Sequence, residues 1–250
     1  NETERAGNDG GGDGKTMKVM FINAINPNSE IQSRFPPLGL GYLVSSLRKH
    51  FGDDVFQFKI VDQNVRNELV SFKPDIVGIT SVSQNYGIAQ NYIKDAYILG
   101  IPVIMGGVHI STLPSSLNKY ADLAIIGEGE KTIIDVIKLF MLTGKFHKEN
   151  LREITGIAFR ENNGDVVLTE KREPITFLDE IPLPARDMFK IDRRSYLFSS
   201  RGCPYSCVFC ASSHFWGKPR FFSAEYVVNE IRELVEKYNV NFITFCDNLM

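Results

Sequence analysis

The sequence has few cysteines, little net charge and no long apolar run. Three of its four cysteines lie within ten residues, which suits a metal site better than scattered disulfides and indicates a reducing compartment. A net charge of -2 gives no sign of a nucleic-acid or membrane surface. No apolar stretch reaches the roughly 18 residues of a membrane span, and no signal peptide is visible. Because apolar residues still make up 43% of the chain, we expect a cytoplasmic globular protein without nucleic-acid or membrane partners.

The clustered cysteines are Cys203, Cys207 and Cys210, at the spacing C-x3-C-x2-C. Three thiolates on a short loop can hold three irons of a cubane cluster and leave the fourth iron open to a substrate or cofactor. Zinc is the alternative, but a structural zinc site closes with four ligands. The nearest fourth donor, His214, has no finger-like spacing. The pattern therefore favours an iron-sulfur cluster over zinc, a disulfide or buried thiols.

This stretch resembles the C-x3-C-x-aromatic-C signature of the radical S-adenosylmethionine (SAM) enzymes, with Phe209 in the aromatic position. In that family a 4Fe-4S cluster binds SAM at its open iron and, once reduced, cleaves it to a 5'-deoxyadenosyl radical. The resemblance implies that Cys203, Cys207 and Cys210 hold the cluster and that Phe209 lies near SAM. It also implies a small-molecule substrate and an external electron donor such as flavodoxin or ferredoxin.

Upstream of the cysteines, apolar strands alternate with helical segments, which is the pattern of an open parallel sheet. Such a sheet, with helices on both faces, makes an α/β flavodoxin-like doubly wound domain whose ligands bind beyond the carboxyl ends of the strands. A short helix is expected near residues 113–120. The expected strands are residues 18–23, 55–61, 75–82, 101–105 and 123–126.

Glycines and small polar residues collect at the ends of these strands. Glycine there lets a large ligand approach the backbone, although ordinary turn chemistry explains the same residues. No G-x-G-x-x-G follows the first strand, so a dinucleotide site is not supported. The residues that could line a ligand site are Ser81 and Ser83 after the third strand, Gly106, Gly107 and His109 after the fourth, and Gly127, Glu128 and Gly129 after the fifth.

Together with the cysteine motif, residues 36–41, 106–109 and 127–130 resemble the cobalamin-binding radical SAM enzymes, the group that includes the anaerobic magnesium-protoporphyrin ester cyclase. The resemblance covers residues 17–250 and implies that the strand-end residues receive the nucleotide tail of cobalamin.

One departure from the pattern concerns the lower ligand of cobalt. Many cobalamin proteins ligate cobalt through D-x-H-x-x-G after the second strand, whereas residues 62–67 read Asp-Gln-Asn-Val-Arg-Asn and contain no histidine. Either the domain has lost cobalamin, or it binds the cofactor without a protein nitrogen on the lower face. His109 is a possible substitute, but a lone histidine in a strand-end turn more often forms hydrogen bonds than binds metal.

The sequence divides into four parts. Residues 1–16 are expected to be disordered or a cloning remnant, and residues 17–147 form the cobalamin-binding domain. Residues 148–194 read as a β-hairpin, turning at Asn163-Gly164, and an extended linker. Residues 195–250 resemble the start of a radical SAM partial (β/α)6 barrel, so we expect the sequence to be truncated and inactive alone. Asp247 follows the second barrel strand, where related enzymes direct polar groups toward the methionine of SAM.

The preferred function is that of a cobalamin-dependent radical SAM enzyme that methylates or oxidatively cyclises an unactivated carbon. A radical SAM methylthiotransferase is one alternative, although it would normally carry cluster cysteines in its first domain, and residues 1–202 have none. A non-catalytic cobalamin-binding module is the other, and turnover of SAM would separate it from the enzymes.

Overall fold

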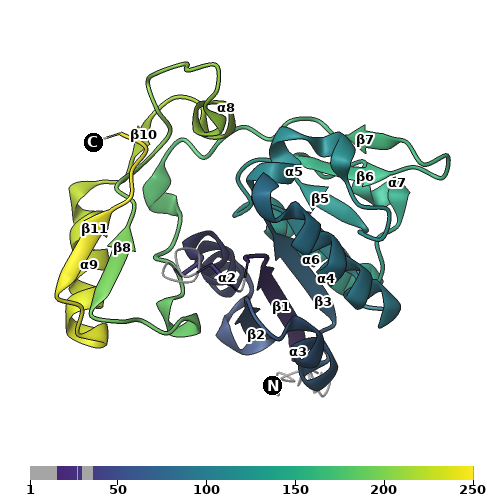
Figure 1. The fold of residues 1–250 in the computed structure, drawn as a ribbon, viewed down its shortest axis with the longest axis horizontal. Coiled ribbons are helices and arrows are strands. Elements are labelled where there is room, and N and C mark those ends of the chain that lie inside the picture. The colour runs from purple at the N-terminus through teal and green to yellow at the C-terminus, as the bar shows by residue number, and fades with distance from the viewer. Residues whose placement is uncertain (1–15, 27, 30–35, 250) are drawn as a thin grey trace, which may run out of the picture.

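The computed structural model describes residues 16–26, 28–29 and 36–249, so all but the last residue of the expected disordered stretch 1–16 lies outside the described residues. The first half of the chain forms one sheet in the order β2-β1-β3-β4-β5-β6-β7 (Figure 1). β1 to β5 are parallel, whereas β6 and β7 are antiparallel to their neighbours. The strands are β1 (Met17–Asn23), β2 (Phe56–Val61), β3 (Ile76–Thr80), β4 (Val103–Gly106), β5 (Leu123–Ile125), β6 (Ile157–Arg160) and β7 (Val166–Leu168).

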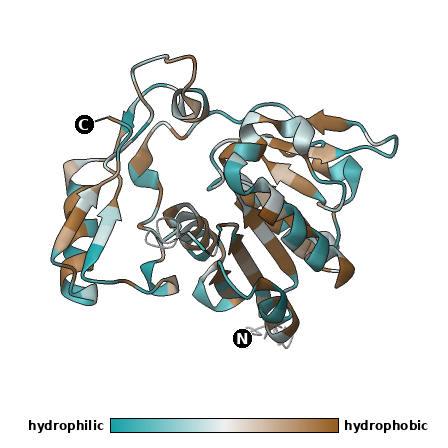
Figure 2. Cartoon of the chain, viewed as in Figure 1, coloured by the Kyte–Doolittle hydropathy of each residue, from teal (hydrophilic) through white to brown (hydrophobic). Residues whose placement is uncertain are grey.

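Helices cover both faces of this sheet, because successive residues of a strand point to opposite sides. In β1, Val19 and Phe21 pack against α2 and α6, while Met20 and Ile22 pack against α3, α4 and α5 on the other face. Figure 2 shows β1 and β3 as mostly hydrophobic, which is typical of parallel strands buried on both faces. The helices of this half are α2 (Leu38–Phe51), α3 (Val65–Phe72), α4 (Tyr86–Ile98), α5 (Val108–Thr112), α6 (Thr132–Thr143) and α7 (Lys148–Leu151), with 3-10 turns at Asp53–Val55, Ser83–Asn85 and Pro114–Ser116.

The predicted doubly wound fold is confirmed, and its parallel part has the flavodoxin-like order 2-1-3-4-5. The helix predicted near residues 113–120 is present only as the 3-10 turn Pro114–Ser116, and the α-helix of this segment lies earlier in the chain. α5 begins at Val108, directly after Gly107, and ends before Pro114, which cannot supply the N–H that a continuing helix needs. His109 consequently lies in a helix instead of a loop.

The predicted hairpin is present, but it belongs to the first sheet. β6 pairs with both β5 and β7, and Gly164 makes the turn with a φ of 91°. The linker that follows is more than an extended connection, because Ile175, Leu178 and Ile181 are buried in a core shared with α2 and the second half of the chain. The linker also forms 3-10 turns at Leu178–Glu180 and Arg186–Met188.

The second half contains one β-α-β unit, as expected for the opening of a barrel, and α2 lies between it and the first sheet (Figure 1). Ser223 caps its long helix by accepting a hydrogen bond from the Tyr226 backbone N–H at 3.1 Å. In the part of the chain that the structure describes, none of the helices has the length and apolar character that crossing a bilayer requires. The elements are β8 (Arg194–Leu197), β9 (Ser200–Arg201), α8 (Ala211–Trp216), β10 (Arg220–Phe221), α9 (Ala224–Tyr238) and β11 (Phe242–Phe245).

Candidate functional site

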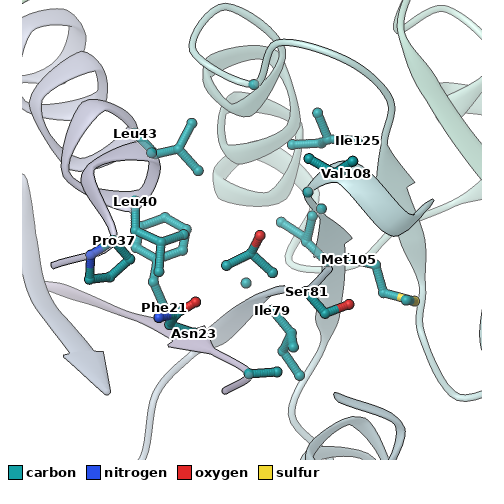
Figure 3. A pocket seen from close by; sticks show the side chains of 18 of the residues that line it. Phe21, Asn23, Pro37, Leu40, Leu43, Ile79, Ser81, Met105, Val108 and Ile125 are labelled. Atoms are coloured by element: carbon teal, nitrogen blue, oxygen red, sulfur yellow. The ribbon is translucent and has the colours of Figure 1, made fainter. Parts of the chain in front are cut away.

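A cavity of about 430 Å³ opens at the carboxyl ends of β1, β3, β4 and β5 (Figure 3). Leu40 and Leu43 of α2 close one side, and the lining is mostly apolar. This is the place where ligands of doubly wound sheets bind. Of the predicted ligand residues, Ser81, Gly106, Gly107, Gly127, Glu128 and Gly129 line the cavity, whereas Ser83 and His109 do not.

The glycines of the cavity have two different roles. At Gly106 and Gly127 an added Cβ would meet no atom within 4 Å, so the missing side chains leave open space, although Gly127 also has a φ of 82° that favours glycine. At Gly107, where φ is 93°, a Cβ would lie 2.3 Å from Thr80 Oγ1, so the fold itself requires glycine there. Gly106 and Gly127 therefore form a cradle that a side chain would fill, and this cradle fits a bulky organic group such as the tail of cobalamin.

His109 is buried beside the cavity and has partners on both ring nitrogens. Its Nδ1 lies 3.0 Å from the Ser83 hydroxyl and its Nε2 lies 3.1 Å from the Ser116 hydroxyl. The ring stacks on Tyr86 at a centroid distance of 4.0 Å. Burial lowers the pKa of His109 and so favours the neutral ring. The geometry supports a hydrogen-bonding role and explains why Ser83 faces His109 instead of the cavity.

The loop after β2 contributes nothing to the cavity. Among the described residues that line it, none comes from the segment 62–67, where Asn64 turns the chain into α3 with a φ of 52°. β2 is the edge strand of the sheet, so its end lies beyond β1, on the side away from β3, β4 and β5. This loop has no imidazole to offer as a lower ligand to cobalt.

The cysteine loop connects β9 to α8, and backbone hydrogen bonds hold its start to the residue that follows α8 and close a turn at its end. The Cys203 N–H donates to the Gly217 carbonyl at 3.3 Å, and the Cys210 N–H donates to the Cys207 carbonyl at 3.0 Å. Among the residues that the structure describes, no group of three Cys, His, Asp or Glu side chains lies together as a metal site. The three thiols nevertheless share one short turn, and their chemistry fits an iron-sulfur cluster.

The two residues predicted to contact SAM have different surroundings. Phe209 lies in the cysteine loop with 89% of its surface exposed. Asp247 follows β11, and its carboxylate accepts hydrogen bonds from the backbone N–H groups of Ser199 at 2.8 Å and Ser200 at 2.9 Å, and from the Ser199 hydroxyl. These bonds hold the chain that leads to Cys203. The contacts of Phe209 and Asp247 with SAM stay a prediction.

A buried charge cluster, which the sequence reasoning missed, joins the sheet to the cysteine loop. Arg201, just before the loop, pairs with Glu128 at 2.8 Å and with Glu130 at 2.6 Å. Arg220, the first residue of β10 after α8, pairs with the other oxygen of Glu128 at 2.7 Å. These four side chains, which we call the charge bridge, are at most 13% exposed. Two carboxylates and two guanidinium groups balance in charge, which makes their burial tolerable.

The charge bridge engages both oxygens of the Glu128 carboxylate. Burial alone would raise the pKa of Glu128, but the hydrogen bonds and charges of Arg220 and Arg201 outweigh it and lower the pKa. The Ile175 N–H donates a further hydrogen bond to the same carboxylate at 2.9 Å. Glu128 lines the cavity, but these partners already neutralise its charge within the protein.

The last wall of the cavity comes from the second half of the chain. α8 starts directly after Cys210 and lies beside α5. Its Phe215 and Trp216 belong to the residues that line the cavity. The ligand cavity and the cysteine loop are therefore neighbours, because α8 begins at the end of the loop and forms part of the cavity wall.

The two halves of the chain match two known families. Residues 28–137 match the B12 binding domain, and residues 197–248 match the Radical SAM superfamily. An uncharacterized methyltransferase of Pyrococcus horikoshii is 32% identical, over 93% of this chain and 54% of its own. The anaerobic magnesium-protoporphyrin IX monomethyl ester cyclase of Rubrivivax gelatinosus is 28% identical, over 92% of this chain and 45% of its own. The chain spans about half the length of these curated relatives.

A solved structure shares the fold. The radical SAM methyltransferase TsrM from Kitasatospora setae, with cobalamin and a [4Fe-4S] cluster bound, superposes with a TM-score of 0.68. The alignment covers 93% of this chain and 49% of TsrM at 17% identity, so it shows likeness of fold alone.

Proposed function

Because the chain belongs to the B12-binding radical SAM family, we propose that the protein acts as a cobalamin-dependent radical SAM enzyme that methylates or oxidatively cyclises an unactivated carbon of a small molecule. The observation that carries the proposal is the shared wall of the site. Phe215 and Trp216, from the helix that follows Cys210, line a cavity whose other sides are the strand ends and α2 of the B12-type domain. The two relatives named above are a methyltransferase and a cyclase, which supports both outcomes.

The residues present fit the implied cofactors. Gly106 and Gly127 leave a cradle for the tail of cobalamin, and Cys203, Cys207 and Cys210 supply thiol donors for the cluster. When bound, the cluster supplies the electron that cleaves SAM, and cobalamin supplies the carrier for a methyl group.

The chain's own residues hold these two sites in place. Asp247 fixes Ser199 and Ser200, and the charge bridge fixes Arg201, so the segment before Cys203 is anchored from both halves of the molecule. We expect this anchoring to orient the cysteine loop toward the cavity.

We also propose that the electron donor lies outside these 250 residues. Their four cysteines comprise the three of the loop and Cys246, so the chain has no cysteine set for a second cluster. We therefore propose that an external donor such as flavodoxin or ferredoxin reduces the cluster.

Incubation of the full-length reconstituted protein with methyl-labelled SAM, cobalamin and a reductant tests the proposal once a substrate is supplied. A methyltransferase yields labelled product with S-adenosylhomocysteine and 5'-deoxyadenosine in equal amounts, whereas a cyclase yields 5'-deoxyadenosine without label in the product. A methylthiolated product would favour the alternative enzyme. If the reduced protein cleaves no more SAM than Cys210→Ala does, the result would favour a non-catalytic cobalamin-binding module.

A further inference from the structure

Arg201 is held by groups from three different parts of the fold. Its guanidinium pairs with Glu128 and Glu130 after β5. The same group lies over the Tyr42 ring of α2 at 5.2 Å and over the Trp216 ring of α8 at 5.0 Å. Only 6% of Arg201 is exposed. A planar cation bound by two carboxylates and two aromatic faces has very little freedom to move.

Trp216 connects this arrangement to the ligand cavity. It lines the cavity, and it ends the six-residue helix α8, too short to hold its own position without tertiary contacts. The Trp216 carbonyl lies 3.3 Å from Arg220 Nη2, so both arginines of the charge bridge contact this residue. The position of the Trp216 ring therefore depends on the charge bridge.

We propose that Arg201 is a positioning residue for the cobalamin site, which acts by holding Trp216 as a wall of the cavity. On this view residues 28–137, which match the B12 binding domain, form an incomplete site, and the segment around the cysteine loop completes it. This inference rests on the proposed function, because it takes cobalamin as the ligand of the cavity.

A double-mutant cycle with the dissociation constant of cobalamin as its readout tests this role. The variants are Trp216→Ala, the charge-balanced pair Arg201→Met with Glu130→Gln, and all three changes together, each titrated calorimetrically with hydroxocobalamin. Loss of one aromatic contact weakens binding by about tenfold, and we expect a similar loss from Arg201→Met with Glu130→Gln. The combined variant should bind no more weakly than Trp216→Ala, because Arg201 acts through Trp216.

Two further variants test whether the geometry of Arg201, and not only the loss of a positive charge, affects cobalamin binding. Arg201→Lys keeps the charge but not the planar fork, and it should weaken cobalamin binding without unfolding the protein. Lys131→Met removes an exposed cation that directly follows Glu130 and pairs with Glu180 at 3.0 Å, and it should not change cobalamin binding.

The outcomes separate the inference from the proposed function. Losses that add to about a hundredfold in the combined variant, or variants that bind as tightly as the wild type, would overturn the role of Arg201 alone. A wild-type protein that does not bind cobalamin would overturn the proposed function, and this inference with it.

Discussion

Two adjacent glycines of the cavity should respond to substitution in opposite ways. Gly107 has φ 93° and ψ -177°, a region that is essentially limited to glycine. An added Cβ would also lie 2.3 Å from Thr80 Oγ1 and 3.0 Å from the Ser81 carbonyl oxygen. The strained backbone costs about 1 to 3 kcal/mol and the overlap about 1 to 3 kcal/mol more. Gly107→Ala should therefore lower the free energy of unfolding by about 2 to 6 kcal/mol.

Gly106 should affect the ligand instead of the fold. Its Cβ would meet no atom within 4 Å, so Gly106→Val should change the free energy of unfolding by less than about 0.5 kcal/mol. The valine side chain would occupy the cradle, and overpacking of about 1 to 3 kcal/mol corresponds to a dissociation constant for cobalamin about 5- to 150-fold higher.

Urea unfolding followed by circular dichroism and titration with cobalamin measure the two effects on the same preparations. Gly106→Val should unfold like the wild type and bind poorly, and Gly107→Ala should unfold at lower urea. If Gly106→Val binds cobalamin like the wild type, or is the less stable of the two variants, the cradle does not lie where the structure puts it.

Three further predictions concern other parts of the molecule. Cys207→Ala should abolish both iron binding and SAM cleavage in the reconstituted full-length protein, while Cys246→Ala should retain both; cleavage by Cys207→Ala would refute the cluster assignment. Since burial lowers the pKa of His109, its contribution to stability is present above the ordinary value of about 6.5 and is lost as the pH falls through the folded-state pKa. The melting temperature of the wild type should thus fall more steeply with decreasing pH below about 6.5 than the melting temperature of His109→Gln. Equal slopes of the two curves would contradict this. Arg186→Met leaves the fully buried Glu230 unpaired and should cost about 3 to 5 kcal/mol of unfolding free energy, most of it recovered by adding Glu230→Gln; a silent single variant would be inconsistent with the pair.

Much of the fold is readable from local patterns. The strand predicted at residues 18–23 is β1 because an apolar run bounded by polar residues is visible without knowledge of its neighbours. The pairing of β6 with β5 is different, because it brings Ile157 beside Ile125 across α6 and α7, and no local pattern records that contact. The same limit applies to the buried linker around Leu178, whose partners come from α2 and from beyond residue 194.

The residues of the site likewise fall into those that a local sequence pattern predicts and those that depend on long-range contacts. The cysteine motif is local, and the glycines of the strand ends are local, so both could be proposed from the sequence. The charge bridge joins residues 71 to 92 positions apart, so neither Glu128 nor Arg201 could be assigned a partner before the fold was known. Its only sequence signal is the placement of one arginine before the cysteine loop and another shortly after α8. Their strand-end position predicts Ser83 and His109 at the ligand, but His109 lies in α5 and its ring contacts the Ser83 hydroxyl of a neighbouring 3-10 turn instead.

One electron paramagnetic resonance spectrum of the reconstituted, cobalamin-loaded and reduced full-length protein tests the central claim most directly, because it reports both cofactors at once. We predict a cob(II)alamin signal without nitrogen splitting, because the cradle at Gly106 and Gly127 holds cobalamin's own nucleotide base away from cobalt, the segment 62–67 has no histidine, and both nitrogens of His109 are occupied. We also predict a reduced-cluster signal that changes when SAM is added, because three cysteines leave one iron open. A three-line nitrogen splitting of the cobalt signal, or a cluster signal indifferent to SAM, would contradict these predictions.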